Sequence, residues 1–409
     1  MSLPASVDAA SGCLALLIWL GLALFRGGFW RLKNCFLPED SDRSLRSRPP
    51  SPGYGRARLS HKRGRETARV AAVIPARNEA ESIACAVRSL LTQRYAGSIR
   101  VFVVDDDSSD GTASLAAEAA VATNALERLI VLRSEPLPAG WTGKLWAVSQ
   151  GIREAAKWNP DFLLLTDADV EHDPSNVAQL VEWAESESLD LTSLMVKLHC
   201  ESFAERLLIP AFVYFFFLLY PPGWTNQVNR RTASAAGGCM LIRPAVLEGI
   251  GGIEAIRGEI IDDCALARAV KQTGGRLWIG LSKSTQSRRA YGSFGEISQM
   301  ISRTAFNQLR HSAALLAGTI AGLIVIYCLP IALTVTGRPL PAILGGAAWL
   351  LMTATFVPLV RFYGLPVIWA LTLPAAAAFY MAATIHSAWK HWTGHGGEWK
   401  GRTQDAAHR

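Results

Sequence analysis

Hydrophobic residues at the two ends of the chain occur in long uninterrupted runs, whereas those in the middle alternate with polar residues. A short run covers residues 12–25, and three longer runs cover residues 313–335, 342–360 and 365–385. The longer runs approach the roughly 20 apolar residues that a helix needs to cross a bilayer. We therefore expect an N-terminal anchor helix and three further transmembrane helices flanking a globular middle region.

The middle of the chain alternates between short β-branched runs and segments whose apolar residues recur at helical spacing. The expected strands cover residues 70–75, 99–104, 129–132 and 162–166, and the expected helices cover residues 78–93 and 144–158. Such an alternation predicts an α/β domain with a mainly parallel sheet covered by helices. In open sheets of this kind, ligands bind at the carboxyl ends of the strands.

A further apolar segment, residues 207–220, differs from the terminal runs because it is rich in Phe and Tyr, contains Pro210 and ends at two prolines. It is too short for an ordinary transmembrane span. Its aromatic content favours a helix that lies in the membrane interface, and a buried core helix is the alternative.

The chain carries 41 Lys and Arg against 34 Asp and Glu, a formal net charge of +7. Much of the excess lies just after the first apolar run, at Arg26, Arg31 and Lys33, and in the C-terminal tail. Basic residues beside a membrane segment mark its cytosolic side, and no nucleic-acid-binding motif accompanies them. We therefore expect a membrane partner, a cytosolic middle region and no nucleic-acid partner. A signal peptide would carry its basic residues before the apolar core, so the first run is expected to remain as an anchor.

The topology of the C-terminal membrane region is less regular. Three crossings from a cytosolic domain would place the C-terminus outside, but the tail is basic, which favours the inside. Pro366 and Pro374 make the last run the one expected to be interrupted or re-entrant.

The seven cysteines are scattered along the chain without a close pair at metal-ligand spacing. This distribution argues against a zinc or disulfide framework and suits a reducing compartment. Together these features divide the chain into an anchor (1–33), a flexible basic linker (34–69), a globular domain (70–311), a C-terminal membrane region (312–388) and a basic tail (389–409).

The first of three acidic clusters begins with Asp105 and Asp106, at the end of the strand expected at 99–104, and breaks into a turn at Gly111. Carboxylates at a strand end can accept hydrogen bonds from the base and the ribose of a nucleoside. Asp is also common in turns and helix caps, so turn formation is the alternative.

The second cluster contains Asp167 and Asp169, directly after the strand expected at 162–166. Carboxylate oxygens suit a hard cation such as Mg²⁺ or Mn²⁺, which would bridge the phosphates of a donor. Two acids spaced by one residue often occur by chance. Their position at the end of a second acidic strand strengthens the interpretation as a metal site.

The third cluster is the pair Asp262 and Asp263, which opens a helix expected to run to Lys271. Asp263 is a candidate general base for an acceptor hydroxyl, and a favourable interaction with the helix N-terminus is the alternative. Lys144 follows Gly143, which lets the backbone approach a ligand, and its ammonium can meet a diphosphate. A solvent-exposed lysine is the alternative for Lys144.

Taken in this order, the residues between about 70 and 310 resemble the inverting family 2 glycosyltransferases, whose GT-A fold is a Rossmann-like fold that binds nucleotide-diphospho-sugars. The matching pieces are Ile74-Pro75-Ala76-Arg77-Asn78-Glu79, Asp105-Asp106, Gly143-Lys144, Asp167-Ala168-Asp169, Gly237-Gly238-Cys239-Met240 and Asp262-Asp263. The resemblance implies a metal-dependent, inverting enzyme that transfers a sugar from a nucleotide-sugar donor, with UDP as the usual nucleotide.

The resemblance also implies roles by position. These are contact with the nucleoside for Pro75, Glu79, Asp105 and Asp106, contact with the donor for Lys144 and Asp167, binding of Mg²⁺ or Mn²⁺ for Asp169 and Asp167, and catalysis for Asp263 with its neighbour Asp262.

Ceramide glucosyltransferase-like and processive members of the family carry a further motif, (Gln/Arg)-x-x-Arg-Trp, after the base. The nearest match here begins at Asn307 and ends at His311, and it retains Arg310. Arg310 is therefore a further catalytic candidate. The departure at the first and last positions counts against a processive polysaccharide synthase.

Three shorter segments, residues 140–147, 303–310 and 399–402, resemble more narrowly the hopene-associated glycosyltransferases of bacterial hopanoid biosynthesis. This resemblance implies a multi-pass protein of the bacterial inner membrane with its catalytic domain in the cytosol. It also implies a lipid acceptor and other hopanoid-pathway enzymes as partners. The alternatives are a ceramide, other lipid or polysaccharide glycosyltransferase, and a non-catalytic membrane scaffold with a transferase-like fold.

Overall fold

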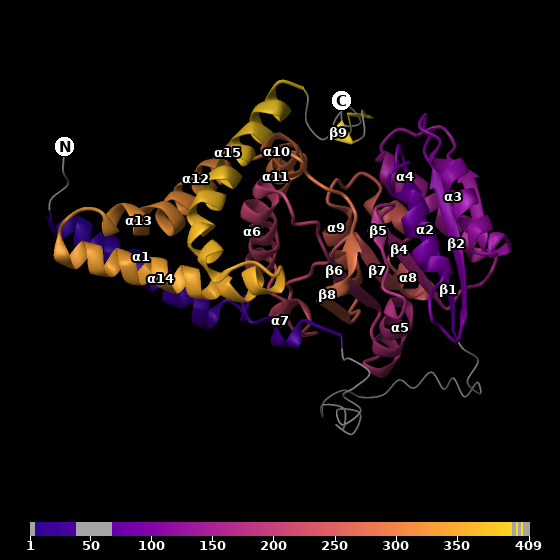
Figure 1. The fold of residues 1–409 in the computed structure, drawn as a ribbon, viewed down its shortest axis with the longest axis horizontal. Helices are drawn as coiled ribbons and strands as arrows, with labels where there is room; N and C mark the ends of the chain where they lie inside the picture. Colours follow the sequence, from indigo (N-terminus) through magenta and orange to yellow (C-terminus); the bar gives the residue numbers. More distant parts are fainter. Residues whose placement is uncertain (1–4, 38–67, 395–397, 400–401, 404–409) are drawn as a thin grey trace.

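The computed structural model describes residues 5–37, 68–394, 398–399 and 402–403 (Figure 1). Most of the predicted basic linker and much of the basic tail lie outside these residues. The described chain has two parts, a domain built on a β-sheet and a group of long apolar helices, which lie next to each other along the long axis of the molecule (Figure 1).

The four predicted strands form the first half of one eight-stranded sheet, in the order β3-β2-β1-β4 with all neighbours parallel. They are β1 (Arg69–Ala76), β2 (Ser98–Asp105), β3 (Leu129–Arg133) and β4 (Phe162–Thr166). Because β1 and β4 are covered on both faces, their apolar residues are continuous rather than alternating. The carboxyl ends of β1, β2 and β4 meet at one edge of the sheet.

The second half of the sheet is mixed and contains β7 (Cys239–Ile242), β6 (Leu191–Lys197), β8 (Leu277–Ser287) and β5 (Val170–Glu171). β7 is antiparallel to both β4 and β6, β6 is parallel to β8, and β5 is antiparallel to β8. The prediction of a mainly parallel sheet is therefore correct for the first four strands, whereas in the second half only β6 and β8 are parallel and the other neighbours are antiparallel. β7 and β5 contain just 4 and 2 residues, too few to give a clear run in the sequence.

Helices cover both faces of the sheet, as the strand and helix alternation predicts. One face packs against α2 (Ile83–Leu91), α3 (Thr112–Ala122) and α5 (Asn176–Ser186), and the other against α4 (Gly143–Ala156), α8 (Pro244–Gly249) and α9 (Asp262–Gln272). The first helix is shorter than predicted: Asn78 has a φ of 51°, and the chain turns there before it enters α2.

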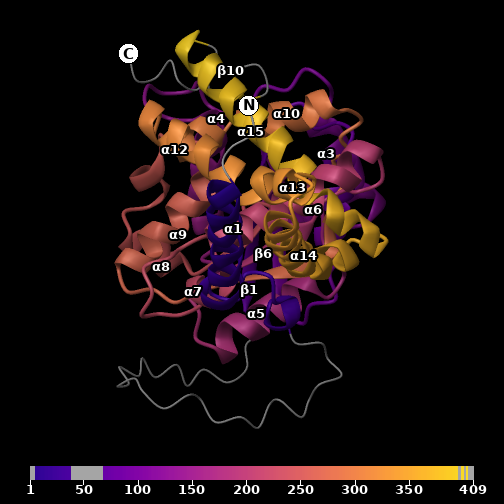
Figure 2. The ribbon, with the colours of Figure 1, turned by 90° about the vertical axis from the view of Figure 1, so that its left-hand side faces the viewer.

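Among the described residues, five helices are long and apolar enough to cross a membrane. Four correspond to the predicted runs. They are α1 (Ala5–Phe25), the pair α12 (Ala313–Leu323) and α13 (Leu329–Thr334) joined by a π-helical turn, α14 (Pro339–Phe362), and α15 (Leu373–Trp392) preceded by a 3₁₀ helix (Val367–Thr372). Figure 2, seen from this end, shows these helices in front of the sheet domain.

The last apolar run is interrupted, as its prolines predict. The 3₁₀ helix begins after Pro366, and α15 starts one residue before Pro374, which therefore occupies the first turn of the helix. Proline is tolerated at that place because its missing N–H would have no partner within the helix.

The fifth apolar helix, α6 (Phe203–Leu219), is the aromatic segment of the sequence, and with α7 (Pro222–Thr225) it reaches 23 residues. The prediction that this segment is too short to span a membrane is therefore wrong on length. The helix begins four residues earlier than predicted, because Ser202 and Glu205 form a capping box at its N-terminus. In Figure 1, α6 runs across the direction of α1 and α14, between these helices and the sheet.

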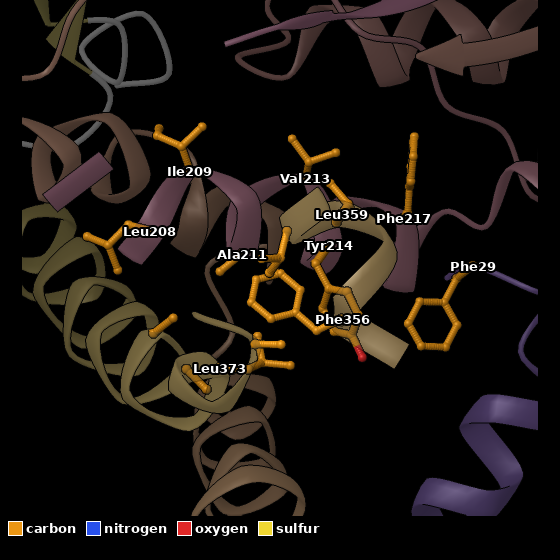
Figure 3. Packing of buried hydrophobic residues seen from close by; sticks show 14 of the residues in the cluster. Phe29, Leu208, Ile209, Ala211, Val213, Tyr214, Phe217, Phe356, Leu359 and Leu373 are labelled. Carbon is orange, nitrogen blue, oxygen red and sulfur yellow. The ribbon is translucent and has the colours of Figure 1, made fainter. Parts of the chain in front are cut away.

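Residues of α6 form the centre of the apolar core that joins the two parts of the molecule (Figure 3). The Tyr214 ring lies 5.1 Å from the Phe356 ring of α14 and 5.3 Å from the Phe29 ring, which follows α1. The same core includes Ile279 and Leu281 of β8. The sheet domain is therefore packed directly on the apolar helices, which fixes its position relative to them.

The remaining elements connect this core to the C-terminus. Helices α10 (Phe294–Ser302) and α11 (Ala305–Gln308) follow β8, and Phe306 of α11 packs against α12 and α15. The short strands β9 (Glu398–Trp399) and β10 (Arg402–Thr403) pair antiparallel near the C-terminus.

Candidate active site

Lys144 lies at the centre of the acidic clusters. Its Nζ is 3.0 Å from Oδ1 of Asp167, at the end of β4, and 3.2 Å from Oδ2 of Asp262, at the start of α9. The Thr142 side chain caps α4 by accepting a hydrogen bond from the Leu145 N–H, which places Lys144 in the first turn. The structure thus brings together three residues that are far apart in the sequence.

Tight packing of α4 on the sheet holds Lys144 at this edge. A Cβ atom on Gly151 of α4 would lie 2.5 Å from Cγ1 of Val73 in β1, so the helix approaches the strand as closely as a glycine allows. The cavity between Lys144, Asp167, Asp262 and Pro75 has a volume of about 20 Å³, room for about one water molecule. The ion pairs therefore fill the centre of the site in this state.

The charges of this centre stabilise one another. Burial opposes the charge of Lys144, but the carboxylates of Asp167 and Asp262 raise its pKa above the ordinary value. Burial likewise opposes the charge of Asp167, but the Lys144 ammonium lowers the pKa of that carboxyl. Lys144 is therefore positive and Asp167 negative at physiological pH.

Asp263 differs from its neighbour because, within the described residues, no ion pair joins its carboxylate to a basic side chain. Its Oδ2 accepts a hydrogen bond from the Gly237 N–H at 2.9 Å, and its Oδ1 accepts one from the Cys264 N–H at 2.6 Å. Burial, and then repulsion from Asp262, raise the pKa of Asp263 to about 6. A carboxyl with such a pKa can accept a proton close to neutral pH, as a general base must.

Gly237 keeps this arrangement compact. A Cβ atom at this position would lie 3.4 Å from Nζ of Lys144 and 3.5 Å from Oδ2 of Asp263. A larger side chain would therefore stand between the lysine and the acids. This geometry gives a physical reason for the glycine-rich segment before β7.

Arg289 joins two further predicted residues. Its guanidinium lies 3.2 Å from Oδ2 of Asp169 and 2.8 Å from Oε1 of Glu79, and the Ser287 hydroxyl donates to Asp169 at 2.9 Å. Arg289 and Ser287 were not predicted as site residues. The signal in the sequence was a basic pair, Arg288 and Arg289, directly after the strand β8.

The first acidic cluster lies at the end of β2. Asp106 is 2% exposed, and its carboxylate lies 3.6 Å from the Arg77 guanidinium. Oδ1 of Asp105 is buried and has no hydrogen-bond partner in the described part of the chain. Since buried polar atoms are almost always paired, this oxygen is suited to a donor group on a ligand.

The pair Asp167 and Asp169 offers the oxygen atoms that a Mg²⁺ or Mn²⁺ ion prefers. No group of three or more His, Cys, Asp or Glu residues that could hold a metal ion is present among the described residues. Mg²⁺ is commonly held by one or two carboxylates together with water and substrate phosphates. The two aspartates therefore fit an ion that is bound jointly with a diphosphate.

Arg310 is separate from this centre. It lies in the turn after α11 with a φ of 51°, and no hydrogen bond or ion pair joins it to the acidic clusters within the described residues. Arg303, seven positions earlier, is the arginine of this segment whose charge acts on Asp167 and lowers its pKa, after the effect of Lys144. This electrostatic effect on Asp167 favours Arg303 over Arg310 as a neighbour of the site.

Comparison with known proteins agrees with this architecture. Residues 71–251 match the family model described as "Glycosyl transferase family 2". No curated protein sequence matches the chain.

Among solved structures, the chain is similar to the mannosyltransferase PcManGT from Pyrobaculum calidifontis in complex with GDP-Man and Mn²⁺, with a TM-score of 0.53 and 18% identity over 94% of this chain and 99% of that one. It is also similar to S. aureus TarS 1-349 in complex with UDP-GlcNAc, with a TM-score of 0.38 and 14% identity over 80% of this chain and 92% of that one. The first likeness, with the family match, confirms the predicted GT-A fold.

Proposed function

We propose that the chain is a family 2 glycosyltransferase that takes a sugar from a nucleotide-sugar donor and transfers it, with inversion, to a lipid at the membrane surface. The family match over residues 71–251 supports the reaction class. The observation that carries this proposal is the position of Asp263. Within the described residues no ion pair joins this carboxylate to a basic side chain, and it lies beside the Lys144 ion-pair centre, in a domain packed on apolar helices.

The donor is bound at the carboxyl ends of β1, β2 and β4. Asp105 has an unpaired buried oxygen for the nucleoside, and Pro75, Glu79 and Asp106 lie on the same edge of the sheet. Lys144 exchanges one of its carboxylate contacts for the diphosphate and stabilises the charge that develops on it as it leaves.

Asp169 and Asp167 would hold a Mg²⁺ or Mn²⁺ ion together with the donor. Such an ion would supply positive charge to the leaving diphosphate. The charges of the centre support this role: Lys144 and Arg289 face the carboxylates of Glu79, Asp167, Asp169, Asp262 and Asp263, so negative charge is in excess.

Asp263 acts as the general base. The acceptor hydroxyl oxygen forms a bond with the anomeric carbon while the bond from that carbon to the diphosphate breaks, and the hydroxyl proton passes to Asp263. The nucleoside diphosphate leaves with the electron pair of the broken bond. A single in-line displacement inverts the anomeric centre and needs no covalent enzyme intermediate.

The way the two parts are joined supports a lipid acceptor. The core around α6 contains residues of β8 and of the apolar helices, so the site is held at a fixed distance from those helices. We place α6 at the membrane surface and the catalytic domain in the cytosol, at a bacterial inner membrane. A hopanoid is the first acceptor to assay, because of the resemblance to hopene-associated glycosyltransferases.

The test is transfer from a panel of radiolabelled nucleotide sugars into extracted membrane lipid by the full-length protein in detergent. Labelled lipid is expected with Mg²⁺ or Mn²⁺ and should disappear with EDTA. Restoring the metal should restore transfer, which controls for damage by the chelator. Absence of labelled lipid with every donor and both metals would overturn the proposal.

A further inference from the structure

A second, larger cavity lies outside the acidic centre. It has a volume of about 780 Å³ and is lined by the end of α6, the loop before β7 and the outer turns of α9. Its lining combines apolar and aromatic side chains with basic ones, among them Leu219, Tyr220, Arg230, Arg231, Arg268 and Lys271.

The charge of this cavity is of one sign. Within the described chain its lining contains four basic side chains and no acidic one. Lys271 is used by the fold, because its ammonium donates to the carbonyls of Thr225 and Thr232 at 2.6 and 2.7 Å and fixes the loop between them. The guanidinium groups of Arg230, Arg231 and Arg268 are exposed to the cavity, where an anion can bind them through charge-assisted hydrogen bonds.

One wall of the cavity lies where the apolar helices end. Arg26 follows α1, and its guanidinium donates to the carbonyls of Leu218 and Leu219 at the end of α6. The Trp224 ring lies below two arginines, 4.9 Å from Arg26 and 5.6 Å from Arg230. Trp and Arg at a helix end are typical of the headgroup region of a bilayer, so these side chains support a position of the cavity opening at the depth of lipid headgroups.

The opposite wall is formed by α9, which also contributes residues to the acidic centre. Helix α9 carries Asp262 and Asp263 in its first turn and Arg268 and Lys271 in later turns. Arg268 is therefore displaced from Asp263 by roughly 7 Å along the helix axis. The Tyr220 hydroxyl, in the cavity lining, is close enough to interact electrostatically with both Asp263 and Arg268.

We propose that this cavity is the acceptor-binding site and that the acceptor is an acidic lipid with a phosphate in its headgroup. The arginines bind the phosphate, since a guanidinium fork matches phosphate oxygens. A hydroxyl of the same headgroup reaches the anomeric carbon and gives its proton to Asp263, as in the reaction proposed above. This inference rests on the proposed function.

The charge of the cavity distinguishes between acceptors. An uncharged lipid, a hopanoid polyol included, could offer the three arginines only neutral hydroxyl acceptors and no compensating negative charge. A phosphate-bearing lipid satisfies them at the depth where its headgroup lies. The cavity thus favours an acidic acceptor over the uncharged hopanoid suggested by the sequence resemblance.

The experiment uses the full-length protein in detergent and total membrane lipid separated on an anion exchanger into acidic and uncharged fractions. With the labelled donor and metal, we expect label in the acidic fraction. Replacing Arg230 and Arg231 together by Gln should raise the KM for acidic lipid about tenfold or more, because charge-assisted hydrogen bonds are lost. The KM for the donor should stay unchanged, which also shows that the variant is folded.

Arg268→Gln, at an exposed position on α9, is a second variant with the same expected effect. Arg276→Gln is the matched control, because Arg276 is also exposed and follows α9 but does not line the cavity. It should leave both KM values unchanged.

Label confined to the uncharged fraction would overturn this inference and leave the proposed function standing, whereas no label in either fraction would overturn both. Transfer to the uncharged fraction that requires added inorganic phosphate would assign the cavity to a free anion and also overturn the lipid proposal. If Arg276→Gln reduced transfer as much as the substitutions at Arg230, Arg231 and Arg268, the effect would not depend on the cavity and the inference would be overturned.

Discussion

The donor centre and the acceptor cavity use basic side chains in opposite ways. In the donor centre, Lys144 and Arg289 are each held between two carboxylates. In the cavity, Arg230, Arg231 and Arg268 face a space whose described lining contains no acid. Helix α9 contributes to both, with Asp262 in the donor centre and Arg268 in the cavity lining.

This difference bears on what each region can do. A cation that already has two partners gains little net free energy from a new anion, because it must exchange one contact for another. Such a centre suits a diphosphate that has to be held in the transition state and then released. An arginine whose described surroundings offer no carboxylate gains a new charge-assisted interaction from an anion, so the cavity suits selection and retention of an anionic lipid.

The largest effect is expected from Asp263. Within the described residues, its carboxylate forms no ion pair with Lys144 or Arg289 and does not line the cavity. Asp263→Asn keeps the size of the side chain but removes the base, so kcat should fall about a thousandfold. The donor KM should change little, because the residue faces the acceptor. Transfer assays with both substrates varied would show this, and Glu154→Gln on the exposed side of α4 is the control. Full activity of Asp263→Asn would exclude this carboxylate as the base.

The residues around Lys144 show how much of the site the sequence can predict. Strand ends and a helix start are local features, so β1, β2 and β4 and the acids that follow them were recognisable from hydrophobic pattern alone. Lys144, Asp167 and Asp262 then come together because parallel strands end at one edge of a sheet.

Arg289 was not predictable in the same way. Its partners Asp169 and Glu79 are 120 and 210 positions away in the chain, and the basic pair Arg288 and Arg289 after β8 does not indicate which acids either arginine will contact. The cavity was also absent from the sequence analysis, because it is assembled from the end of α6, the loop before β7 and α9. Short strands such as β5 were missed for a simpler reason, since 2 residues form no pattern.

The second largest effect is expected from breaking the paired centre at Lys144. Lys144→Met leaves Asp167 and Asp262 without their common cation, which should destabilise the fold by about 2–3 kcal/mol. Transfer should fall about a hundredfold with a raised donor KM, since the leaving diphosphate loses a stabilising charge. Lys157→Met is the matched control, because that ammonium pairs with Glu154 at the surface. Equal effects of the two substitutions on donor KM would contradict a donor role for Lys144.

A smaller, graded effect is expected from pH. Because the pKa of Asp263 is raised to about 6, the base is protonated below that pH and kcat/KM should fall about tenfold for each pH unit. Above it the carboxylate is charged and the profile should be flat until another group titrates. The residual activity of Asp263→Asn should lack this acid limb. A wild-type profile that stays level down to pH 4.5 would be incompatible with Asp263 as the base.

The smallest effect tests whether the ion pairs of Arg289 with Glu79 and Asp169 belong to the donor centre. Arg289→Gln removes the cation between Glu79 and Asp169 and should raise the donor KM about five- to tenfold, because both acids then repel the diphosphate. Arg288→Gln is its neighbour and control, since Arg288 pairs with Glu171 instead and should change the donor KM less than about twofold. If Arg288→Gln has the larger effect, Arg289 serves the fold and the paired donor centre is limited to Lys144 and its two aspartates.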